Sequence, residues 1–489
     1  MKKISIIGLG AGDVSQMPLG VYERLTEAKH LFFRTEKHPV AQQLKERGIS
    51  FQSFDSFYEK AESFPEVYDL ICKELLNQAR ELEEILFAVP GHPMVAEQTT
   101  QLLLKQAADG GVDVEVLGGQ SFLDAMFTAL KIDPVEGFVL LDALRLDRKN
   151  INPQVHTIIT QVYDDLSASE VKLTLMEVFP DEYPIKLVLA AGVEGEEQIL
   201  SMPLYELDHI KGTHNLAAVY IPPTEDERIL NRQFSTLREI ISILRSPEGC
   251  PWDREQTHKS IRKHLIEETY EVLETIDDDD PEAMCEEMGD LLMQVMLHSQ
   301  IAEDEGDFTV EDVISVLNEK LIRRHPHVFG EKQVDSSDQV LVNWDQIKAQ
   351  EKKDKGEDQE KKSLLDGIPR DLPALMSAFE ISKKASKVGF DWDQVQDVYA
   401  KIEEEMEEVK QARNEVEIKA ELGDLLFAVA NLARFLKVDP EEALALTNRK
   451  FKSRFGYIEN RLKESNKSVT EASLDEMEVL WQEAKQTIG

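Results

Sequence analysis

Two stretches in the second half of this 489-residue chain repeat one another. Five blocks occur in both stretches in the same order: CPWDREQ with FDWDQVQ, IEETYEV with EEEMEEV, EMGDLLMQV with ELGDLLFAV, LNEKLIRRH with TNRKFKSRF, and NWDQIKA with LWQEAKQ. Collinear blocks of this kind indicate an internal duplication, so each copy is expected to fold into the same unit. Both copies are rich in glutamate and leucine and place apolar residues three and four positions apart, which predicts helices almost throughout.

Each copy contains the acidic pattern EExxE followed by ExxD. Residues three or four positions apart share a face of a helix, and a turn between two antiparallel helices would bring both acidic pairs face to face. Carboxylates held together repel one another and require a cation, and an all-oxygen ligand set selects Mg²⁺ or Mn²⁺. The predicted metal ligands are Glu268, Glu271, Glu287 and Asp290 in the first copy, and Glu405, Glu408, Glu421 and Asp424 in the second.

A solvated acidic face is the ordinary explanation of a single EExxE segment. The ExxD halves argue for more, because EMGDLLMQV and ELGDLLFAV embed the acids in an apolar helix, where unpaired charge is costly. A glycine precedes the aspartate in both copies, which suggests a close approach of another backbone. Together with the duplication, these features favour a metal site in which the first glutamates, Glu267 and Glu404, orient an attacking water.

Both copies resemble the MazG nucleotide pyrophosphohydrolases, a family of all-α enzymes. The motifs are GCPWDREQTH, EETYEV, EEMGDLL and RRHPHVFG in the first copy, and KVGFDW, EEEMEEV, ELGDLLFAVANLAR and NRKFKSRF in the second. The resemblance spans about residues 228–488. It implies hydrolysis of nucleoside triphosphates to monophosphates and pyrophosphate with Mg²⁺, and it assigns the same eight carboxylates to the metal.

Basic residues accompany the acidic motifs in both copies. Lys450 and Arg454 lie four apart on a predicted helix, and Lys320 and Arg324 are their counterparts in the first copy. Side chains of this kind neutralise phosphate oxygens that a metal does not reach. These four residues are therefore the predicted contacts to the substrate phosphates.

One further cation differs between the copies. Lys401 precedes Glu405 by one turn, whereas the first copy has His264, a weaker cation at neutral pH, at the equivalent place. This difference favours the second copy as the active one and a structural role for the first. Trp481 and its counterpart Trp344 suit stacking on a nucleobase, but packing in a core explains either residue equally well.

The first 220 or so residues have a different character. The runs ISIIGLG, ILFAVPG, VDVEVLGG, VKLTLMEVF and IKLVLAAGV are predicted strands, and MPLGVYERLTEAK and AEQTTQLLLKQAADGG are predicted helices between them. Alternation of strands and helices favours an α/β fold. The double proline of YIPPTEDER marks its boundary, near Pro222.

Three of these strands end in glycine-containing turns, GLGAGD, VPGHP and LGGQS. The first has the spacing GxGxGD, so it lacks the GxGxxG pattern of dinucleotide-binding folds. Glycines at strand ends allow backbone to approach a ligand, and three such turns at carboxyl ends suggest a ligand crevice. Tight turns without a ligand remain the alternative for each turn taken singly.

The order of these motifs resembles that of the tetrapyrrole (precorrin-like) methylases, over about residues 2–222. The resemblance implies two α/β subdomains that bind S-adenosylmethionine between them. Ala11 stands where the family usually has proline, and His92 where it usually has aspartate. The residues expected near the cofactor are Leu9, Val89, His92, Met94, Val95, Ser121 and Phe122.

The combination resembles the YabN-type family of fusion proteins. The predicted fold is multidomain, with a methylase-like domain at 1–222, MazG repeats at 228–347 and 367–489, and a polar linker at 348–366. The leading hypothesis is a metal-dependent pyrophosphohydrolase fused to a methyltransferase of unknown acceptor. In the alternative, the first domain is a non-catalytic sensor of S-adenosylmethionine or another small ligand, which the departures at Ala11 and His92 favour. A third hypothesis makes the helices a divalent-cation store.

The composition of the chain limits the kinds of partner that it is expected to bind. A formal net charge of −39 opposes general nucleic-acid binding, since phosphates would be repelled. Three cysteines without a CxxC pair imply no disulfide framework, and no apolar stretch is long enough to span a bilayer. We therefore expect a cytoplasmic protein with nucleoside triphosphates as partners and no membrane. MazG proteins are commonly dimers, so the resemblance allows a homodimer as well as a bundle formed within one chain.

Overall fold

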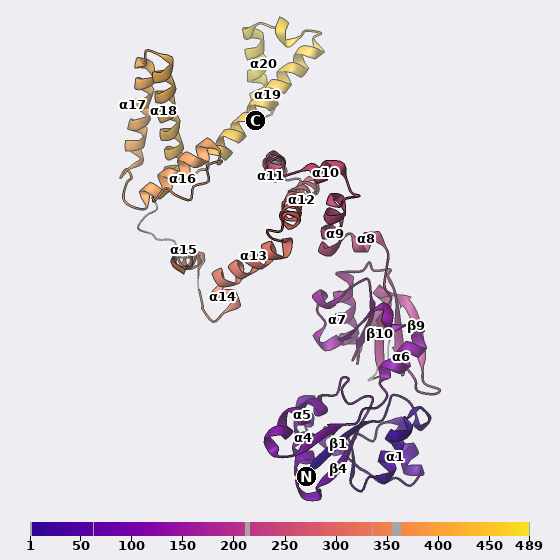
Figure 1. The fold of residues 1–489 in the computed structure, drawn as a ribbon. Coiled ribbons are helices and arrows are strands. Elements are labelled where there is room, and N and C mark those ends of the chain that lie inside the picture. The colour runs from indigo at the N-terminus through magenta and orange to yellow at the C-terminus, as the bar shows by residue number, and fades with distance from the viewer. Residues whose placement is uncertain (1, 62, 211–215, 335, 355–362, 489) are drawn as a thin grey trace. The chain divides into compact units, whose positions relative to one another are not determined.

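The computed structural model describes residues 2–61, 63–210, 216–334, 336–354 and 363–488. The chain forms two compact units, Met1–Ile314 and Ser315–Gly489. The first unit carries two β-sheets followed by helices, and the second, as far as it is described, consists of helices (Figure 1). The predicted fold class, an α/β part followed by an all-α part, is confirmed.

The first sheet has the strand order β3-β2-β4-β1-β5, and its pairings are parallel. Its strands are β1 (Lys3–Gly8), β2 (Leu31–Phe33), β3 (Gln52–Ser53), β4 (Glu84–Val89) and β5 (Asp113–Val116). Successive residues of β1 reach opposite faces, so Ile6 packs with Phe87 in one apolar cluster and Ile7 packs in another. Because parallel strands end at the same edge, the glycine turns after β1, β4 and β5 lie together, as predicted.

Five helices accompany this sheet: α1 (Leu19–Glu27), α2 (Pro39–Glu46), α3 (Asp55–Tyr58), α4 (Phe64–Leu82) and α5 (Gln98–Gly110). The spacing of buried residues explains the longest of them. In α4, Ile71, Leu75 and Ala79 repeat every four positions and are fully buried. They join the same cluster as Ile6, so α4 covers one face of the sheet.

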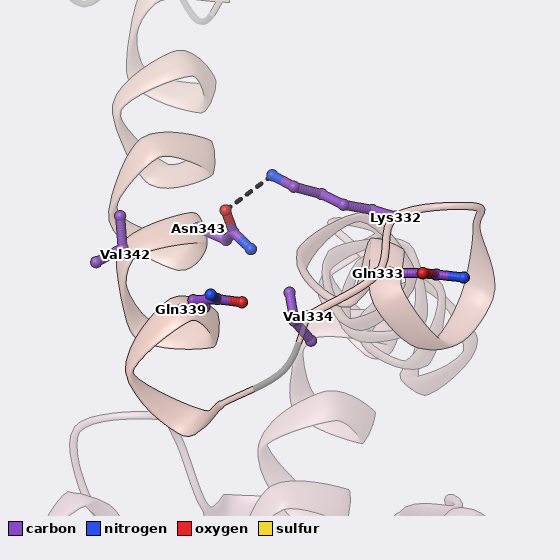
Figure 2. A pocket seen from close by; sticks show the side chains of 6 residues that line it. All are labelled: Lys332, Gln333, Val334, Gln339, Val342 and Asn343. Carbon is purple, nitrogen blue, oxygen red and sulfur yellow. Dashed lines mark hydrogen bonds between the residues drawn. The ribbon is translucent and has the colours of Figure 1, made fainter.

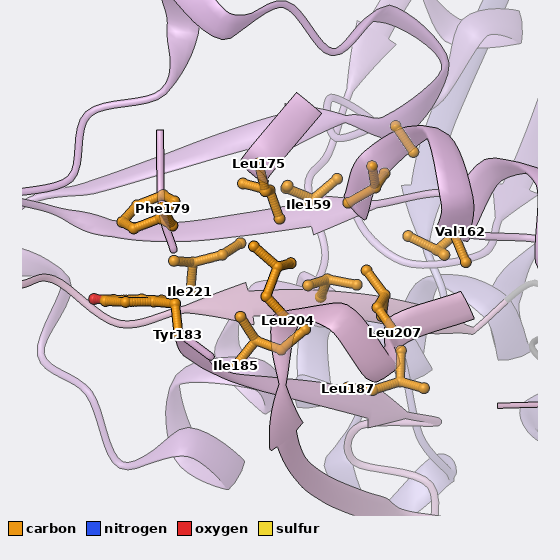
Figure 3. Packing of buried hydrophobic residues seen from close by; sticks show 14 of the residues in the cluster. Ile159, Val162, Leu175, Phe179, Tyr183, Ile185, Leu187, Leu204, Leu207 and Ile221 are labelled. Carbon is orange, nitrogen blue, oxygen red and sulfur yellow. The ribbon is translucent and has the colours of Figure 1, made fainter. Parts of the chain in front are cut away.

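The second sheet has the order β6-β7-β10-β8-β9. Its strands are β6 (Phe138–Asp142), β7 (His156–Thr160), β8 (Pro184–Leu189), β9 (Gln198–Pro203) and β10 (Ala217–Ile221). Only the pairing of β6 with β7 is parallel among these described strands. Figure 3 shows its main apolar cluster, in which Ile159, Leu187 and Ile221 from the strands meet Leu175 and Phe179.

One predicted strand is a helix. The run VKLTLMEVF lies in and just after α7 (Asp165–Met176). Asp164 begins the helix with a capping box, since its carboxylate accepts a hydrogen bond from the Ser167 amide at 2.8 Å. Ala168, Val171 and Leu175 are then buried at helical spacing against the sheet. Capping and the period of burial outweigh the strand preference of valine and threonine.

The rest of the chain is helical where it is described. The helices of the first unit are α6 (Phe122–Leu130), α7, α8 (Glu227–Leu230), α9 (Phe234–Arg245), α10 (Pro251–Glu255), α11 (Arg262–Asp277) and α12 (Pro281–Glu305), besides those already named. Helix α13 (Val310–Arg324) crosses the boundary between the units. The second unit continues with α14 (Pro326–Phe329), α15 (Ser337–Asp354), α16 (Ala374–Ser386), α17 (Val395–Gln411), α18 (Glu415–Leu436), α19 (Pro440–Glu464) and α20 (Leu474–Thr487). None of the helices in the described ranges has the length and apolarity that crossing a bilayer requires.

The expected polar linker at 348–366 begins too early. Helix α15 continues to Asp354, because lysine, glutamine and glutamate are good helix formers. Residues 355–362 of the expected linker lie outside the described residues. At the other boundary, β10 ends at Ile221 and α8 begins at Glu227, close to the expected break near Pro222.

Candidate metal, nucleotide and cofactor sites

Two helical hairpins, α11–α12 and α17–α18, carry the acidic motifs. Side-chain caps begin the second helix of each hairpin. Asp280 accepts hydrogen bonds from the amides of Glu282 and Ala283, and Asn414 accepts them from Val416 and Glu417. These caps fix where each second helix starts, and hence which carboxylates face each other.

The first hairpin brings three predicted ligands together. Glu268, Glu287 and Asp290 each offer a carboxylate oxygen, and these oxygens lie within 4.8 Å of one another. Glu271, the fourth predicted ligand, lies beside them. Partial burial raises the pKa of Glu268, and so do its hydrogen bond to the carboxylate of Glu271 and the charge of Asp290. Burial, Glu271 and Asp290 likewise raise the pKa of Glu287.

The second hairpin forms the matching group, Glu405, Glu408 and Glu421, again with oxygens within 4.8 Å of one another. Burial raises the pKa of Glu408, and the charges of Glu405 and Glu421 add to the effect. Glu405 is only 5% exposed, and its Oε2 has no hydrogen-bond partner. Asp424, one turn after Glu421, is exposed and does not belong to this group of three.

These observations fit a bound divalent cation. A buried carboxylate oxygen without a partner is costly, and like charges at short range raise one another's pKa. A cation among the oxygens would relieve both effects.

The glycines before the two aspartates do not lie against another segment of the chain. A Cβ on Gly289 or Gly423 would meet no atom within 4 Å. The predicted close approach of another backbone is wrong at both positions.

The predicted catalytic glutamates sit at the rim of each group. Lys401 places its Nζ 2.9 Å from Oε1 of Glu404 and 2.7 Å from Oε1 of Glu405. Both carboxylates raise the pKa of this ammonium. In the first copy, Nδ1 of His264 lies 2.8 Å from Oε2 of Glu267. The difference between the two copies is therefore present in the structure as a lysine that bridges two glutamates and a histidine that pairs with one.

The predicted phosphate contacts of the second copy lie on α19, a different helix from those of the acidic group. The guanidinium of Arg454 stands 5.7 Å from the ring centre of Trp481 on α20. Trp481 also packs on Phe451, with ring centres 5.1 Å apart. Lys450, one turn before Arg454, is exposed. The pairing of Arg454 with Trp481 joins two predicted substrate residues, and the contact with Phe451 gives the tryptophan a packing role as well.

The first copy treats the equivalent arginine differently. Arg324 donates to Glu351 of α15 through Nε at 3.2 Å and Nη2 at 2.7 Å, and Arg323 donates to the same carboxylate at 2.8 Å. The two arginines lower the pKa of Glu351 to about 2. Lys320, one turn before Arg324, is half-buried. The sequence comparison missed Glu351, whose matched position in the second copy is Ile488.

A hollow of about 300 Å³ lies beside α15 (Figure 2). Its lining residues are Lys332, Gln333, Val334, Gln339, Val342 and Asn343. The ammonium of Lys332 donates a hydrogen bond to Oδ1 of Asn343 at 2.8 Å, so the positively charged group of this lining is already paired with a neighbouring side chain. Among the residues that the structure describes around this hollow, the lining contains no carboxylate.

The third candidate site lies at the carboxyl ends of β1, β4 and β5. Backbone hydrogen bonds connect these turns. The amide of Leu9 donates to the carbonyl of Val89 at 2.8 Å, and the amide of Gly91 donates to the carbonyl of Gly10 at 2.9 Å. The contact between turns is close, because a Cβ on Gly119 would lie 2.6 Å from the Cα of Gly8. Only glycine fits there.

One turn at this edge leaves open space beside its backbone. Gly91 has a φ of +68°, and a Cβ built on it would meet no atom within 4 Å. Oε1 of Gln120, in the turn after β5, is buried without a hydrogen-bond partner. The open space at the Gly91 backbone and the unpaired oxygen of Gln120 are two separate features that a bound cofactor would complete.

The predicted cofactor residues occupy these turns. Leu9 and Val89 are buried where β1 and β4 end, and Met94 is exposed in the turn after β4. The amide of Met94 donates to Nδ1 of His92, and that of Val95 donates to the carbonyl of His92. Ser121 caps α6, the helix that begins at Phe122, by accepting from the Leu123 amide at 3.1 Å. The structure thus gathers the predicted residues at one edge of the sheet, and it adds Gln120 and, as shown below, His38.

Three family models match separate parts of the chain. A model of the tetrapyrrole (corrin/porphyrin) methylases matches residues 3–208. A model of the MazG nucleotide pyrophosphohydrolase domain matches residues 256–329, and one of phosphoribosyl-ATP pyrophosphohydrolase matches residues 372–451. Each of the last two matches part of one copy, including its acidic motifs.

Curated relatives agree with this division. YabN of Bacillus subtilis (strain 168) is 50% identical over 489 residues, which cover 99% of each chain. The nucleoside triphosphate pyrophosphohydrolase/pyrophosphatase MazG of Thermotoga maritima is 48% identical over 252 residues, 52% of this chain and 95% of that protein. The nucleoside triphosphate pyrophosphohydrolase of Escherichia coli (strain K12) is 43% identical over 259 residues, 52% of this chain and 97% of that protein.

Fold, motifs and matches define a class of protein in which a tetrapyrrole methylase domain precedes a MazG nucleotide pyrophosphohydrolase region. The chain belongs to the YabN family of such fusions. The predicted resemblance is confirmed in both halves.

Proposed function

We propose that the helical part hydrolyses nucleoside triphosphates to monophosphates and pyrophosphate, and that the acidic group of the second copy holds the required Mg²⁺ or Mn²⁺. The observation that carries the proposal is the buried Oε2 of Glu405, which has no partner although two further carboxylates approach it. MazG of Thermotoga maritima and the pyrophosphohydrolase of Escherichia coli are both named for nucleoside triphosphate substrates, which supports the choice of substrate class.

Glu405, Glu408 and Glu421 would hold the metal, with Asp424 one turn further along α18. A divalent cation there neutralises charge on the phosphates and on the departing pyrophosphate. The first group has the same ligand types but lacks the lysine, so we assign the first copy a structural role.

The remaining chemistry falls to side chains. Glu404, held by Lys401, orients the attacking water, as Glu267 would in the first copy. Lys450 and Arg454 neutralise phosphate oxygens, since a guanidinium and an ammonium match the charge of the triphosphate. Trp481 beside Arg454 supplies a flat apolar surface for the base.

The test is pyrophosphate release by the full chain from a mixture of nucleoside triphosphates. Release is expected with Mg²⁺ or Mn²⁺ and should stop when the metal is chelated. Glu405→Gln should abolish it. Absence of release under every metal, with Mg²⁺ still bound, would instead support a cation store. Separate assays with single nucleotides then identify the preferred base.

For the first domain we propose binding of S-adenosylmethionine and methyl transfer to an acceptor. The open space above Gly91 and the unpaired Gln120 Oε1 support the binding step. A non-catalytic sensor that regulates the hydrolase is the alternative, favoured by Ala11 and His92. Labelled S-adenosylmethionine, incubated with the protein and cell extract, distinguishes the two: a labelled acceptor supports transfer, and cofactor binding without labelling supports the sensor.

We also propose that the protein works in the cytoplasm and as a homodimer. Cys72, Cys250 and Cys285 are all free, which suits a reducing compartment. The net charge of −39 supports the absence of nucleic-acid partners. The apolar face of α18, on which Leu422, Leu426 and Val429 are exposed, supports the dimer.

A further inference from the structure

His38, in the loop between β2 and α2, makes two hydrogen bonds that identify its tautomer. The backbone amide of Val40 donates to Nδ1 at 3.3 Å, and Nε2 lies 3.0 Å from the carbonyl oxygen of Gly10. An amide can only donate and a carbonyl can only accept. Nδ1 is therefore the acceptor, and Nε2 carries the proton that it donates to Gly10.

The carbonyl of Gly10 is the point where three loops meet. It accepts from Nε2 of His38 and also from the amide of Gly91 at 2.9 Å. Gly10 belongs to the turn after β1, Gly91 to the turn after β4, and His38 to the loop after β2. Gly10 has a φ of +81°, a conformation that glycine adopts without strain. The two hydrogen bonds to its carbonyl therefore hold the orientation of this peptide group.

The ring of His38 is neutral over the whole physiological range. Burial lowers the pKa of His38 to about 4, and the positive charge of Arg34 contributes, although the bond to Gly10 acts in the opposite direction. The ring thus donates a hydrogen bond without adding positive charge. The neutral state of this ring is favourable next to the proposed site for S-adenosylmethionine, because a second cation there would repel the positively charged sulfonium.

We propose that His38 is a positioning residue for the cofactor: by holding the Gly10 carbonyl, it keeps the GLGAGD backbone in the conformation that binds S-adenosylmethionine. The inference rests on the proposed binding of that cofactor. Pre-organised backbone lowers the entropy lost on binding, so loss of the bond should weaken affinity even though His38 does not contact the ligand.

Three substitutions in the full chain separate the two hydrogen bonds. In His38→Gln the amide nitrogen reaches the place of Nε2, whereas in His38→Asn the shorter side chain retains an acceptor near Nδ1 but does not reach Gly10. His38→Ala removes both bonds. His30→Asn makes the same exchange just before β2 and is the matched control.

The measurement is calorimetric binding of S-adenosylhomocysteine, with the melting temperature of each variant recorded. We expect a dissociation constant within about threefold of the unmodified protein for Gln and an increase of about tenfold or more for Asn and Ala, as for loss of one good hydrogen bond. Hydrogen exchange at the Gly91 amide should quicken in the Asn variant even without ligand.

The outcomes separate the two proposals. If the unmodified protein binds no S-adenosylhomocysteine or S-adenosylmethionine, the proposed cofactor function fails, and exchange at Gly91 still reports on the bond. If the protein binds and Asn binds equally well, the role of His38 is overturned. A loss in Gln equal to that in Ala, at unchanged melting temperature, overturns it as well.

Discussion

The ammonium of Lys401 lies 2.7 Å from Oε1 of Glu405, whereas Oε2 of the same carboxylate is buried without a partner. One oxygen is thus neutralised and the other is left available. Because Lys401 also binds Glu404, a single side chain orients a proposed metal ligand and the proposed water-activating group. The first copy has no equivalent bridge, since His264 pairs with Glu267.

Replacing Lys401 by alanine should lower kcat/KM for pyrophosphate release by about tenfold or more, because both glutamates lose the cation that orients them. Steady-state pyrophosphate release measures the effect. Lys410→Ala is the control on the same helix, where the lysine pairs with exposed Glu407 at 3.1 Å. Equal losses in the two variants would contradict the special role of Lys401.

Removing one carboxylate from each copy tests which of them is active. Glu405→Gln should reduce turnover about 100-fold or more, since it removes a ligand charge at a buried position. Glu268→Gln is expected to change turnover by less than about threefold. Single-turnover assays of both variants provide the comparison. The reversed pattern would place the active site in the first copy.

The sequence predicted the helical part well because its signals are local. The spacing of Glu268, Glu287 and Asp290, together with the Asp280 cap, is sufficient to bring these carboxylates together. Non-local pairings were not predictable. Arg324 and Glu351 meet only because of the path between α13 and α15, which no motif encodes.

The α/β part repeats this lesson. The sequence correctly predicts strands that end in glycine, but its strand prediction for VKLTLMEVF is wrong, because the β-branched residues there obscure the helical spacing of Val171 and Leu175. The role of His38 is not predictable from the sequence, because a lone histidine before proline indicates nothing beyond a helix start. Its partner Gly10 lies far away in sequence and becomes a neighbour only through the pairing of β1, β4 and β2.

Glu351→Gln should destabilise the protein by about 1 kcal/mol at pH 7, as is typical of partly exposed ion pairs. A carboxylate with a lowered pKa stabilises the fold above its ordinary pKa of 4.5, and this stabilisation is lost as the pH falls toward about 2. The difference between variant and unmodified protein should therefore shrink across that window. Urea unfolding at several pH values measures it. Asp354→Asn, which removes a carboxylate from the same helix, is the control variant.

The homodimer has a testable surface on α18. Leu422, Leu426 and Val429 share one side of this helix at three- and four-residue spacing and are between 43 and 51% exposed in one chain. We expect light scattering to give twice the chain mass of 55.6 kDa. Leu426→Glu should shift the population toward monomer, because burying a charge against apolar surface is costly. Leu474→Glu, at an exposed helix start, should leave the mass unchanged.

The contact between Gly8 and Gly119 makes the glycine turns depend on one another. A methyl group on Gly119 would overlap Gly8, and one on Gly8 would lie 2.2 Å from the carbonyl oxygen of Gly91. Substitutions in any one of these turns are therefore restricted by the backbone atoms of the other two. A graft that transplants one of these turns from a distant homologue must therefore bring the other two with it.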